Sequence, residues 1–286
     1  MGNDVLVTGA NGFLGRHLVS ALSGTGRRVH AHSIADGDVA RCELRYEGVG
    51  HVFHLAARVF VPESWRDPLP FYETNVLGTV NVLEFCRRTK ASITFLSSYV
   101  YGRPRRLPVG EDHPLEAFNP YAQTKLFGEQ ICRFYESSFG VAAAIVRPFN
   151  LYGEGQDPRF LIPLLVRQAL DPALDAITVA DLRPRRDHLY VGDFVKLLVR
   201  TIGRSGTYNA GSGVSHSIEE LVAVINRAAG VAKPVRADGQ ERPTEILDVA
   251  ADIGKARREF GWAPETGLAE GIGRVVEAMR ERPAHG

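Results

Sequence analysis

The chain has 286 residues, of which 44% are hydrophobic and 23% charged, proportions typical of a globular protein with one large or two small domains. Its formal net charge of +1 gives no overall field that would attract nucleic acid or a membrane surface. No apolar run approaches the ~18–20 residues that span a bilayer, and no basic region followed by an apolar stretch suggests secretion. The separated Cys42, Cys86 and Cys132 suit neither a disulfide framework nor a metal site, so we expect a reducing, cytoplasmic setting and no metal.

The first predicted strand, 5–8, runs directly into Gly9, Gly12 and Gly15 and then into a predicted helix over 13–22. Glycines at such a junction allow a tight turn, close approach of the backbone to a pyrophosphate, and close packing of helix on strand. The free N–H groups at the helix start also favour phosphates. A glycine triplet with this spacing is by itself a weak signal, because most glycine-rich turns are only turns. Its position directly after the first strand favours dinucleotide binding.

Strands and helices alternate through the first half of the chain. Further strands are predicted at 29–32, 51–55, 93–96 and 142–146, and helices at 71–88 and 121–138. Short apolar strands alternating with helices predict a parallel sheet covered on both faces, which right-handed crossovers turn into a doubly wound, Rossmann-type α/β fold. We assign residues 1–150, together with about 187–211, to a dinucleotide-binding domain.

The alternation stops after residue 150, where prolines interrupt the pattern. A strand is predicted at 177–179, and helices at 193–202, 252–260 and 268–280. Ser217 and Glu220 have the spacing of a capping box that opens a helix reaching residue 229. We expect residues 151–186 and 212–286 to form a smaller substrate-binding α/β region. It would close over the carboxyl edge of the sheet, where open α/β sheets bind their ligands.

Tyr121 and Lys125 are four residues apart at the start of a predicted helix, so their side chains share one face. A lysine ammonium near a phenol would lower the phenol's pKa from about 10, which allows proton exchange with an alcohol or ketone near neutral pH. The spacing is common, and its ordinary interpretation is an aromatic residue beside a solvated charge. Ser97 and Ser98 follow strand 93–96, where a hydroxyl can either hydrogen-bond a reacting oxygen or simply end the strand.

Several longer motifs accompany these residues in order along the chain. They are Thr8-Gly-Ala-Asn-Gly-Phe-Leu-Gly15, His54-Leu-Ala-Ala57, Ser64 before Asp67-Pro68, Asn75-Val-Leu-Gly-Thr79, Ser97-Ser-Tyr-Val-Tyr-Gly102, Arg147-Pro-Phe-Asn-Leu-Tyr-Gly153, Arg186-Asp-His-Leu-Tyr-Val-Gly-Asp193 and Phe260-Gly-Trp-x-Pro264. Together they resemble the extended short-chain dehydrogenase/reductase family, in its NAD-dependent epimerase/dehydratase branch. The resemblance covers nearly the whole chain.

This resemblance implies roles for individual residues. Tyr121 would be the proton donor and acceptor, and Lys125 would bind the nicotinamide ribose. Ser97 would take the family's Ser/Thr position when the chain is aligned on Val100-Tyr101-Gly102, with Ser98 as the alternative after a one-residue slip. The other implied cofactor contacts are Gly9, Asn11, Gly12, Phe13, Leu14, Gly15, Ser33, Asp38, Val39, Leu55, Ala56, Ala57, Asn75 and Pro148. The implied contacts to a nucleotide-linked sugar are Ser98, Asn150, Arg186 and Arg242.

The segment after strand 29–32 departs from the family. Members that use NAD generally end this strand with an acid that binds the adenosine ribose, whereas Ser33 stands here and Asp36 lies farther along. A missing acid removes repulsion against a 2′-phosphate, so we expect NADP slightly ahead of NAD. The side chains available to contact that phosphate are Arg16, Arg41, His30 and His32.

A second departure concerns the reaction. Sugar 4,6-dehydratases of the family resemble one another in having an Asp-Glu pair after the catalytic Thr, whereas Ser98 and Tyr99 stand here, which disfavours dehydration. We therefore expect an NAD(P)-dependent oxidoreductase acting on a nucleotide-activated sugar, with 4-keto reduction placed first. The alternatives are a nucleotide-sugar 4-epimerase with retained NAD, a ketoreductase for a polyketide-like ketone, and a non-catalytic NAD(P)-binding sensor. The resemblance also implies a homodimer built on helices 71–88 and 121–138.

Overall fold

A six-stranded sheet with the order β2-β1-β3-β4-β5-β9 lies at the centre of the computed structural model, which describes residues 2–239 and 245–281. All neighbouring strands are parallel. The strands are β1 (Asp4–Thr8), β2 (Val29–His32), β3 (Val49–His54), β4 (Ser92–Leu96), β5 (Ala143–Pro148) and β9 (Gly206–Ala210). The predicted Rossmann-type fold is confirmed. The edge strand β9 was not predicted, because Gly-Thr-Tyr-Asn-Ala has no apolar run.

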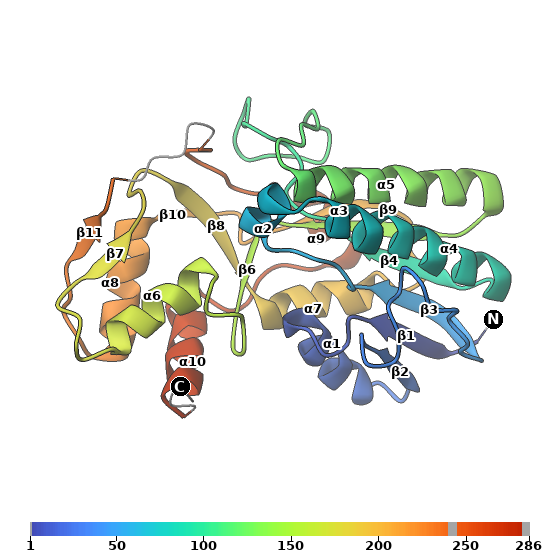
Figure 1. Ribbon diagram of the computed structural model, residues 1–286, viewed down its shortest axis with the longest axis horizontal. Helices are drawn as coiled ribbons and strands as arrows, with labels where there is room; N and C mark the ends of the chain where they lie inside the picture. Colours follow the sequence, from blue (N-terminus) through green and yellow to red (C-terminus); the bar gives the residue numbers. More distant parts are fainter. Residues whose placement is uncertain (1, 240–244, 282–286) are drawn as a thin grey trace.

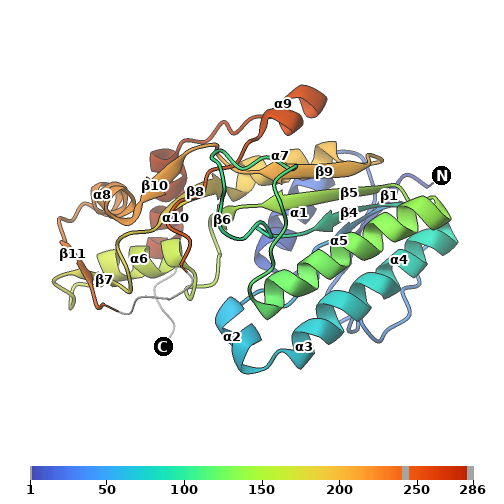
Figure 2. The ribbon, with the colours of Figure 1, turned by 90° about the horizontal axis from the view of Figure 1, so that it is seen from above.

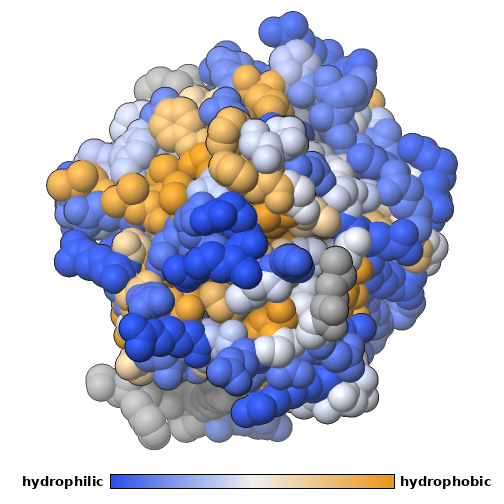
Figure 3. All heavy atoms as spheres, turned by 90° about the vertical axis from the view of Figure 1, so that its right-hand side faces the viewer, coloured by the Kyte–Doolittle hydropathy of each residue, from blue (hydrophilic) through white to orange (hydrophobic). Residues whose placement is uncertain are grey.

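Helices cover both faces of the sheet (Figures 1 and 2). On one face lie α1 (Phe13–Ser23) and α7 (Val191–Arg200), which pack against each other. On the other lie α4 (Gly78–Thr89) and α5 (Pro120–Phe139). Hydrophilic residues predominate on the side of the molecule drawn in Figure 3, with separate apolar areas between them. In the described residues, no helix is long and apolar enough to cross a membrane.

The helix predicted over 71–88 is interrupted. The chain forms α2 (Val61–Arg66), α3 (Leu69–Tyr72) and a π-helical turn, η1 (Glu73–Leu77), before α4 begins. Asn75 lies in this turn, and its side chain accepts a hydrogen bond from Arg58 N (2.8 Å) and donates one to Arg58 O (3.0 Å). Such turns inside helices are frequent at functional sites. Here the turn places the Asn75 side chain against Arg58, in the segment that follows β3.

Most of the chain after β5 forms what we call the smaller lobe, whereas α7 and β9 belong to the large sheet and the helices that cover it. Among the described residues, the lobe contains a three-stranded sheet of order β10-β8-β6, a two-stranded sheet and three helices. Its elements are β6 (Asn150–Tyr152), α6 (Leu161–Leu170), β7 (Ile177–Val179), β8 (Arg185–Tyr190), β10 (Ser215–Ser217), α8 (Ile218–Ala229), β11 (Val235–Ala237) and α10 (Leu268–Glu281). The predicted capping box is confirmed, since Ser217 Oγ accepts from Glu220 N (3.1 Å) and Glu220 Oε2 accepts from Ser217 N (2.7 Å).

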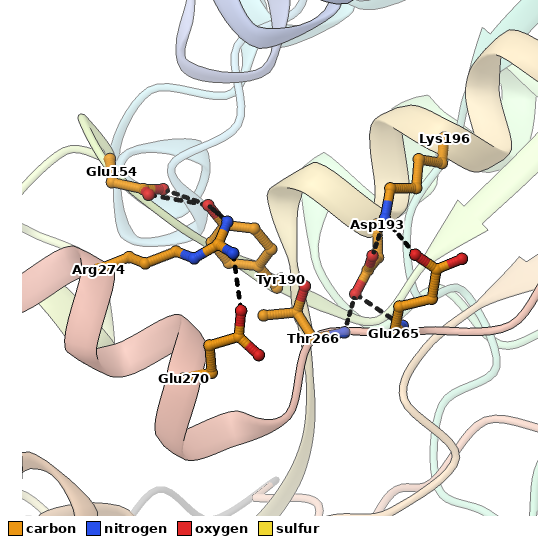
Figure 4. A network of polar contacts seen from close by, with 8 residues as sticks. All are labelled: Glu154, Tyr190, Asp193, Lys196, Glu265, Thr266, Glu270 and Arg274. Atoms are coloured by element: carbon orange, nitrogen blue, oxygen red, sulfur yellow. Dashed lines mark hydrogen bonds and ion pairs between the residues drawn. The ribbon is translucent and has the colours of Figure 1, made fainter.

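The smaller lobe is joined to the sheet by apolar and polar contacts. One continuous cluster of buried apolar side chains includes Val7 of β1 and Leu18 of α1 together with Ile225 of α8 and Val275 of α10. Asp193 at the start of α7 accepts hydrogen bonds from Glu265 N (3.0 Å) and Thr266 N (2.7 Å), as Figure 4 shows. Both contacts hold α10 and its preceding loop beside the sheet. The short helix α9 (Gly254–Phe260) packs against β9.

Candidate active site

A cavity of about 400 Å³ lies between the carboxyl edge of the sheet and the smaller lobe. It is lined by the glycine turn, by residues after β3, β4 and β5, and by the start of α5, with the smaller lobe on its other side. Of the predicted site residues, Gly9, Gly12, Phe13, Leu14, Gly15, Leu55, Ala57, Ser97, Ser98, Tyr121, Pro148 and Asn150 line it. Its size suits a small-molecule ligand.

The glycine turn is shaped to admit a ligand close to the backbone. Gly9 has φ +69, a conformation that side chains disfavour. A Cβ on Gly15 would lie 2.2 Å from Gly9 O, so only glycine fits there. Helix α1 begins after Gly12 with no side-chain cap and no acidic residue in its first turn. Such a helix start suits the phosphates of a dinucleotide. Asn11 lies exposed in the same turn.

The end of β2 carries an acid that the sequence analysis did not place there. The chain turns back after Ser33, so that Asp36 Oδ2 accepts hydrogen bonds from Ser33 N (2.9 Å) and Ser33 Oγ (2.8 Å). The bond from the Ser33 backbone lowers the pKa of Asp36, which is therefore charged at neutral pH. The preference for NADP rested on the absence of an acid here, and the approach of Asp36 to Ser33 removes that support, so the choice between NAD and NADP stays a prediction. The four basic side chains considered for a 2′-phosphate have other contacts: Arg16 with Gly155 O, Arg41 with Glu73, His30 with Asp4, and His32 with Tyr46.

Other predicted cofactor residues lie just outside the cavity. Ala56 N donates to Thr8 Oγ1 (3.3 Å), which ties the residues after β3 to the end of β1. Asp38 Oδ1 accepts from Ala40 N (2.9 Å), and Val39 is buried beside Gly78. Their roles toward a cofactor, like that of Asn75, stay predictions.

Tyr121 and Lys125 lie on the first turns of α5, as predicted. Asn119 caps the helix by accepting a hydrogen bond from Ala122 N (2.8 Å), and Pro120 fills the first helical position. Lys125 is buried, donates to Leu96 O (2.8 Å) and lies 5.2 Å above the centre of the Phe95 ring. Burial lowers the pKa of Lys125 to about 8.

The expected effect of Lys125 on the phenol is not found in the protein alone. Burial raises the pKa of Tyr121, and the polar Ser98 side chain works against this increase. The physical reason is that the Lys125 ammonium is directed to a backbone carbonyl.

The two serines after β4 point to different partners. Ser97 Oγ donates to Glu129 Oε1 (2.6 Å) and is 2% exposed, whereas the Ser98 side chain works to lower the pKa of Tyr121, and both of these residues line the cavity. Neighbouring residues in extended chain point to opposite sides, which explains the difference. Both serines line the cavity, so which of them takes the family's Ser/Thr position stays a prediction.

A buried ion pair lies behind the serines, and the sequence analysis missed it. Arg147 Nε and Nη2 donate to Glu129 Oε1 (2.8 Å) and Oε2 (2.6 Å). Burial works to raise the pKa of Glu129, but the hydrogen bonds and charge of Arg147 outweigh it and lower that pKa overall. Glu129 is four residues after Lys125 on the same face of α5, and this spacing was the available signal.

The substrate residues predicted in the smaller lobe lie on its three-stranded sheet. Asn150 on β6 lines the cavity and donates from Nδ2 to Asp187 O (3.0 Å). Arg186 on β8 forms an ion pair with Glu245 and donates to Arg185 O (2.9 Å). Arg242 lies outside the described residues. His188, which the sequence analysis did not select, also lines the cavity.

The model of the NAD dependent epimerase/dehydratase family matches residues 5–211. The chain belongs to this family. The match includes the glycine turn, both serines and the Tyr121–Lys125 pair. The protein is therefore an NAD-dependent enzyme of the short-chain dehydrogenase/reductase type, in a family of nucleotide-sugar epimerases, dehydratases and reductases.

Individual relatives are similar over their full length. A putative UDP-glucose 4-epimerase from Methanocaldococcus jannaschii is 33% identical, with 96% of this chain and 98% of the relative covered. GDP-6-deoxy-D-mannose reductase from Pseudomonas aeruginosa is 30% identical, with 99% of each covered. The crystal structure of a UDP-glucose 4-epimerase from Stenotrophomonas maltophila, with bound NAD and formylated UDP-arabinopyranose, superposes with a TM-score of 0.91 at 26% identity, covering 97% of this chain and 98% of that one.

Proposed function

We propose that this enzyme is a nucleotide-sugar 4-epimerase that retains NAD. The observation that carries the choice of cofactor is the Asp36 carboxylate, held against Ser33 at the end of β2. A charged acid there would accept hydrogen bonds from the ribose hydroxyls and would repel a 2′-phosphate. The epimerases among the relatives support the same function, and this proposal replaces 4-keto reduction, which the sequence analysis placed first.

The residues present fit NAD. The glycine turn leaves no room for side chains, and the start of α1 offers uncapped N–H groups to the pyrophosphate. Lys125 uses one of its three N–H donors on Leu96 O, which leaves two for the nicotinamide ribose. NAD bound there would accept a hydride from the sugar in the oxidation, and its reduced form would return the hydride in the reduction.

The chain's own chemistry is proton transfer and orientation. Tyr121 would take the proton of the sugar hydroxyl during oxidation and return it during reduction. Ser98, which lines the cavity together with Tyr121, would hold the reacting oxygen in place. Between the oxidation and the reduction, the keto sugar would rotate in the cavity and present its other face to the nicotinamide.

Elimination of water lacks a base in this site. Among the described residues that line the cavity, none is Asp or Glu. Tyr99, which follows the two serines where dehydratases carry an acid, donates its hydroxyl to Gly102 O (2.7 Å). Glu129 is bonded to Arg147 behind the serines. This supports hydride transfer without loss of water.

Reduction of a 4-keto sugar is the second candidate. It is supported by the 30% identity to GDP-6-deoxy-D-mannose reductase over the whole chain. A reductase would consume an external nicotinamide cofactor in each turnover, whereas an epimerase regenerates its own. The reaction of a polyketide-like ketone is disfavoured, because the relatives that match the whole chain are named for nucleotide-sugar substrates.

The test uses the purified enzyme without added cofactor. We expect mass spectrometry of the denatured protein to release NAD, and UDP-glucose or UDP-N-acetylglucosamine to be converted to its 4-epimer. The Tyr121→Phe variant should keep its NAD and lose the conversion. A protein that carries no nucleotide and instead oxidises NADPH with a nucleotide-linked 4-keto-6-deoxy sugar would be a reductase.

We further propose a homodimer formed by the helices on the α4–α5 side. Large apolar side chains stay exposed on these helices, namely Trp65, Leu69, Leu77, Phe127, Phe134 and Phe139. A second copy would cover this surface. Light scattering should show a dimer for the wild type and a monomer for Leu77→Glu combined with Phe134→Glu. A monomeric wild type would reject the proposal.

A further inference from the structure

His188 occupies a place between the two predicted substrate residues of the smaller lobe. It lies on β8 directly opposite Asn150 of β6. Arg186 is two residues before it on the same strand, so both side chains lie on one face of the sheet. Across the other neighbouring strand, His216 of β10 lies opposite Arg186. His188 lines the same cavity as Ser98 and Tyr121.

The His188 ring has an unsatisfied nitrogen. The residue is 6% exposed, and its Nε2 has no hydrogen-bond partner. Its ring meets the edge of Tyr152 with centroids 6.3 Å apart, a contact that uses carbon atoms. A buried polar atom without a partner is unfavourable and rare in native proteins, so each one calls for an explanation.

The neighbours of His188 favour an anion. Burial lowers the pKa of His188 to about 3, with further lowering by His216 and Arg186, so the ring is neutral at neutral pH and has one N–H donor. Tyr152 is the titratable group that faces it from β6, and no acidic side chain contributes to its pKa. Arg186 is the permanent cation nearby, and its ion pair with Glu245 leaves other guanidinium donors.

We propose that His188 is a substrate ligand whose Nε2–H donates to a phosphoryl oxygen of the nucleoside diphosphate. This inference rests on the proposed function, because it requires a nucleotide-linked substrate that extends from Tyr121 toward Arg186. The diphosphate would then lie beside the His188 imidazole, between Asn150 and Arg186. The phosphoryl oxygen of the ligand would be the hydrogen-bond acceptor that His188 Nε2 lacks in the protein alone.

Two substitutions separate this role from packing. His188→Phe keeps an aromatic ring against Tyr152 and removes the donor, while His188→Gln keeps an amide N–H. We expect His188→Phe to weaken binding of UDP or GDP by about tenfold, the usual effect of losing a hydrogen bond to a charged acceptor. KM for the nucleotide sugar should rise equally, with kcat changed less than about twofold. His188→Gln should recover most of the affinity.

The thermal stability of His188→Phe should not fall along with its affinity for nucleotides. Replacing an unpartnered buried nitrogen by carbon should leave the melting temperature of His188→Phe unchanged or raised. His216→Phe is the matched control, because His216 Nδ1 is also buried and unpartnered but His216 does not line the cavity. This control should bind the nucleotides as the wild type does.

The outcomes are distinguishable by calorimetry on the NAD-loaded enzyme. Wild-type protein that binds neither UDP nor GDP would overturn both the proposed function and this inference. Wild-type binding with an unchanged affinity in His188→Phe would overturn the inference alone. Should His188→Phe not fold, NMR of isotope-labelled histidine in the wild type decides, since UDP or GDP must shift the His188 ring signals and an unmoved resonance would reject the contact.

Discussion

The two walls of the cavity are built differently. On the side of the large sheet the wall contains the three glycines at the start of α1, together with residues at the ends of β3, β4 and β5. On the side of the smaller lobe it is made of side chains on a short polar sheet, among them Asn150 and His188. The glycine turn follows from the fold itself. Side chains of the smaller lobe can be altered one by one, so we expect the choice of substrate to depend on them.

This difference divides the expected effects of substitutions. Changes on the large-sheet side should alter the chemistry or the binding of NAD for every substrate alike. Changes in the smaller lobe should alter KM for the nucleotide sugar and leave bound NAD untouched. The following experiments test the large-sheet side of this comparison, beginning with the largest effect.

Tyr121→Phe should lower kcat by about a thousandfold, because it removes the proton-transfer group. Retained NAD should stay at the wild-type level, since the glycine turn and the start of α1 are unchanged. Kinetics of epimerisation together with mass spectrometry of bound nucleotide check both statements. A variant that keeps a tenth of the activity would show that another group moves the proton.

Ser98→Ala should lower kcat by about a hundredfold, the usual effect of losing one donor to a reacting oxygen. Ser97→Ala is the matched control. Its kcat should change by less than about threefold, while the free energy of unfolding should fall by about 1 kcal/mol, because Glu129 loses one hydrogen bond but keeps Arg147. The reverse pattern would support the motif alignment that favoured Ser97.

Asp36→Asn should weaken NAD binding by about tenfold and bring the affinities for NAD and NADP closer together, because the repulsion against a 2′-phosphate is lost. Ser33→Ala removes only the side-chain bond to Asp36 and keeps the backbone one, so its effect should be smaller. Titration of the cofactor-free enzyme with both nucleotides measures this. An unchanged preference in Asp36→Asn would remove the main support for NAD.

The smallest effect concerns pH. Because burial lowers the pKa of Lys125 to about 8, raising the pH through this value converts its ammonium to an amine. The amine has one N–H fewer for the ribose once Leu96 O is satisfied, so NAD affinity should fall by about fivefold between pH 7 and pH 9.5. Lys125→Met should bind NAD more weakly and show no such fall. Equal pH dependence in both proteins would assign the titration to another group.

What could be predicted from sequence follows the same division between backbone and side chains. The apolar strands, the glycine turn and the capped start of α5 depend on local patterns, and the structure contains them. The strands β8 and β10 escaped prediction because Arg-Arg-Asp-His and Ser-His-Ser have no apolar alternation. The approach of Asp36 to Ser33 required knowledge of how the chain turns after β2, which spacing alone does not contain.

The apolar cluster that continues from β1 and α1 into α8 and α10 has a consequence for protein engineering. The smaller lobe of a relative cannot be grafted onto this protein as an independent module in order to change its specificity. The apolar side chains of the grafted lobe would have to pack against the buried faces of this protein's β1 and α1, which they do not match. The buried faces of α1 and α7 would have to be transplanted with it. Exchanging single polar residues at the rim of the lobe avoids this incompatibility.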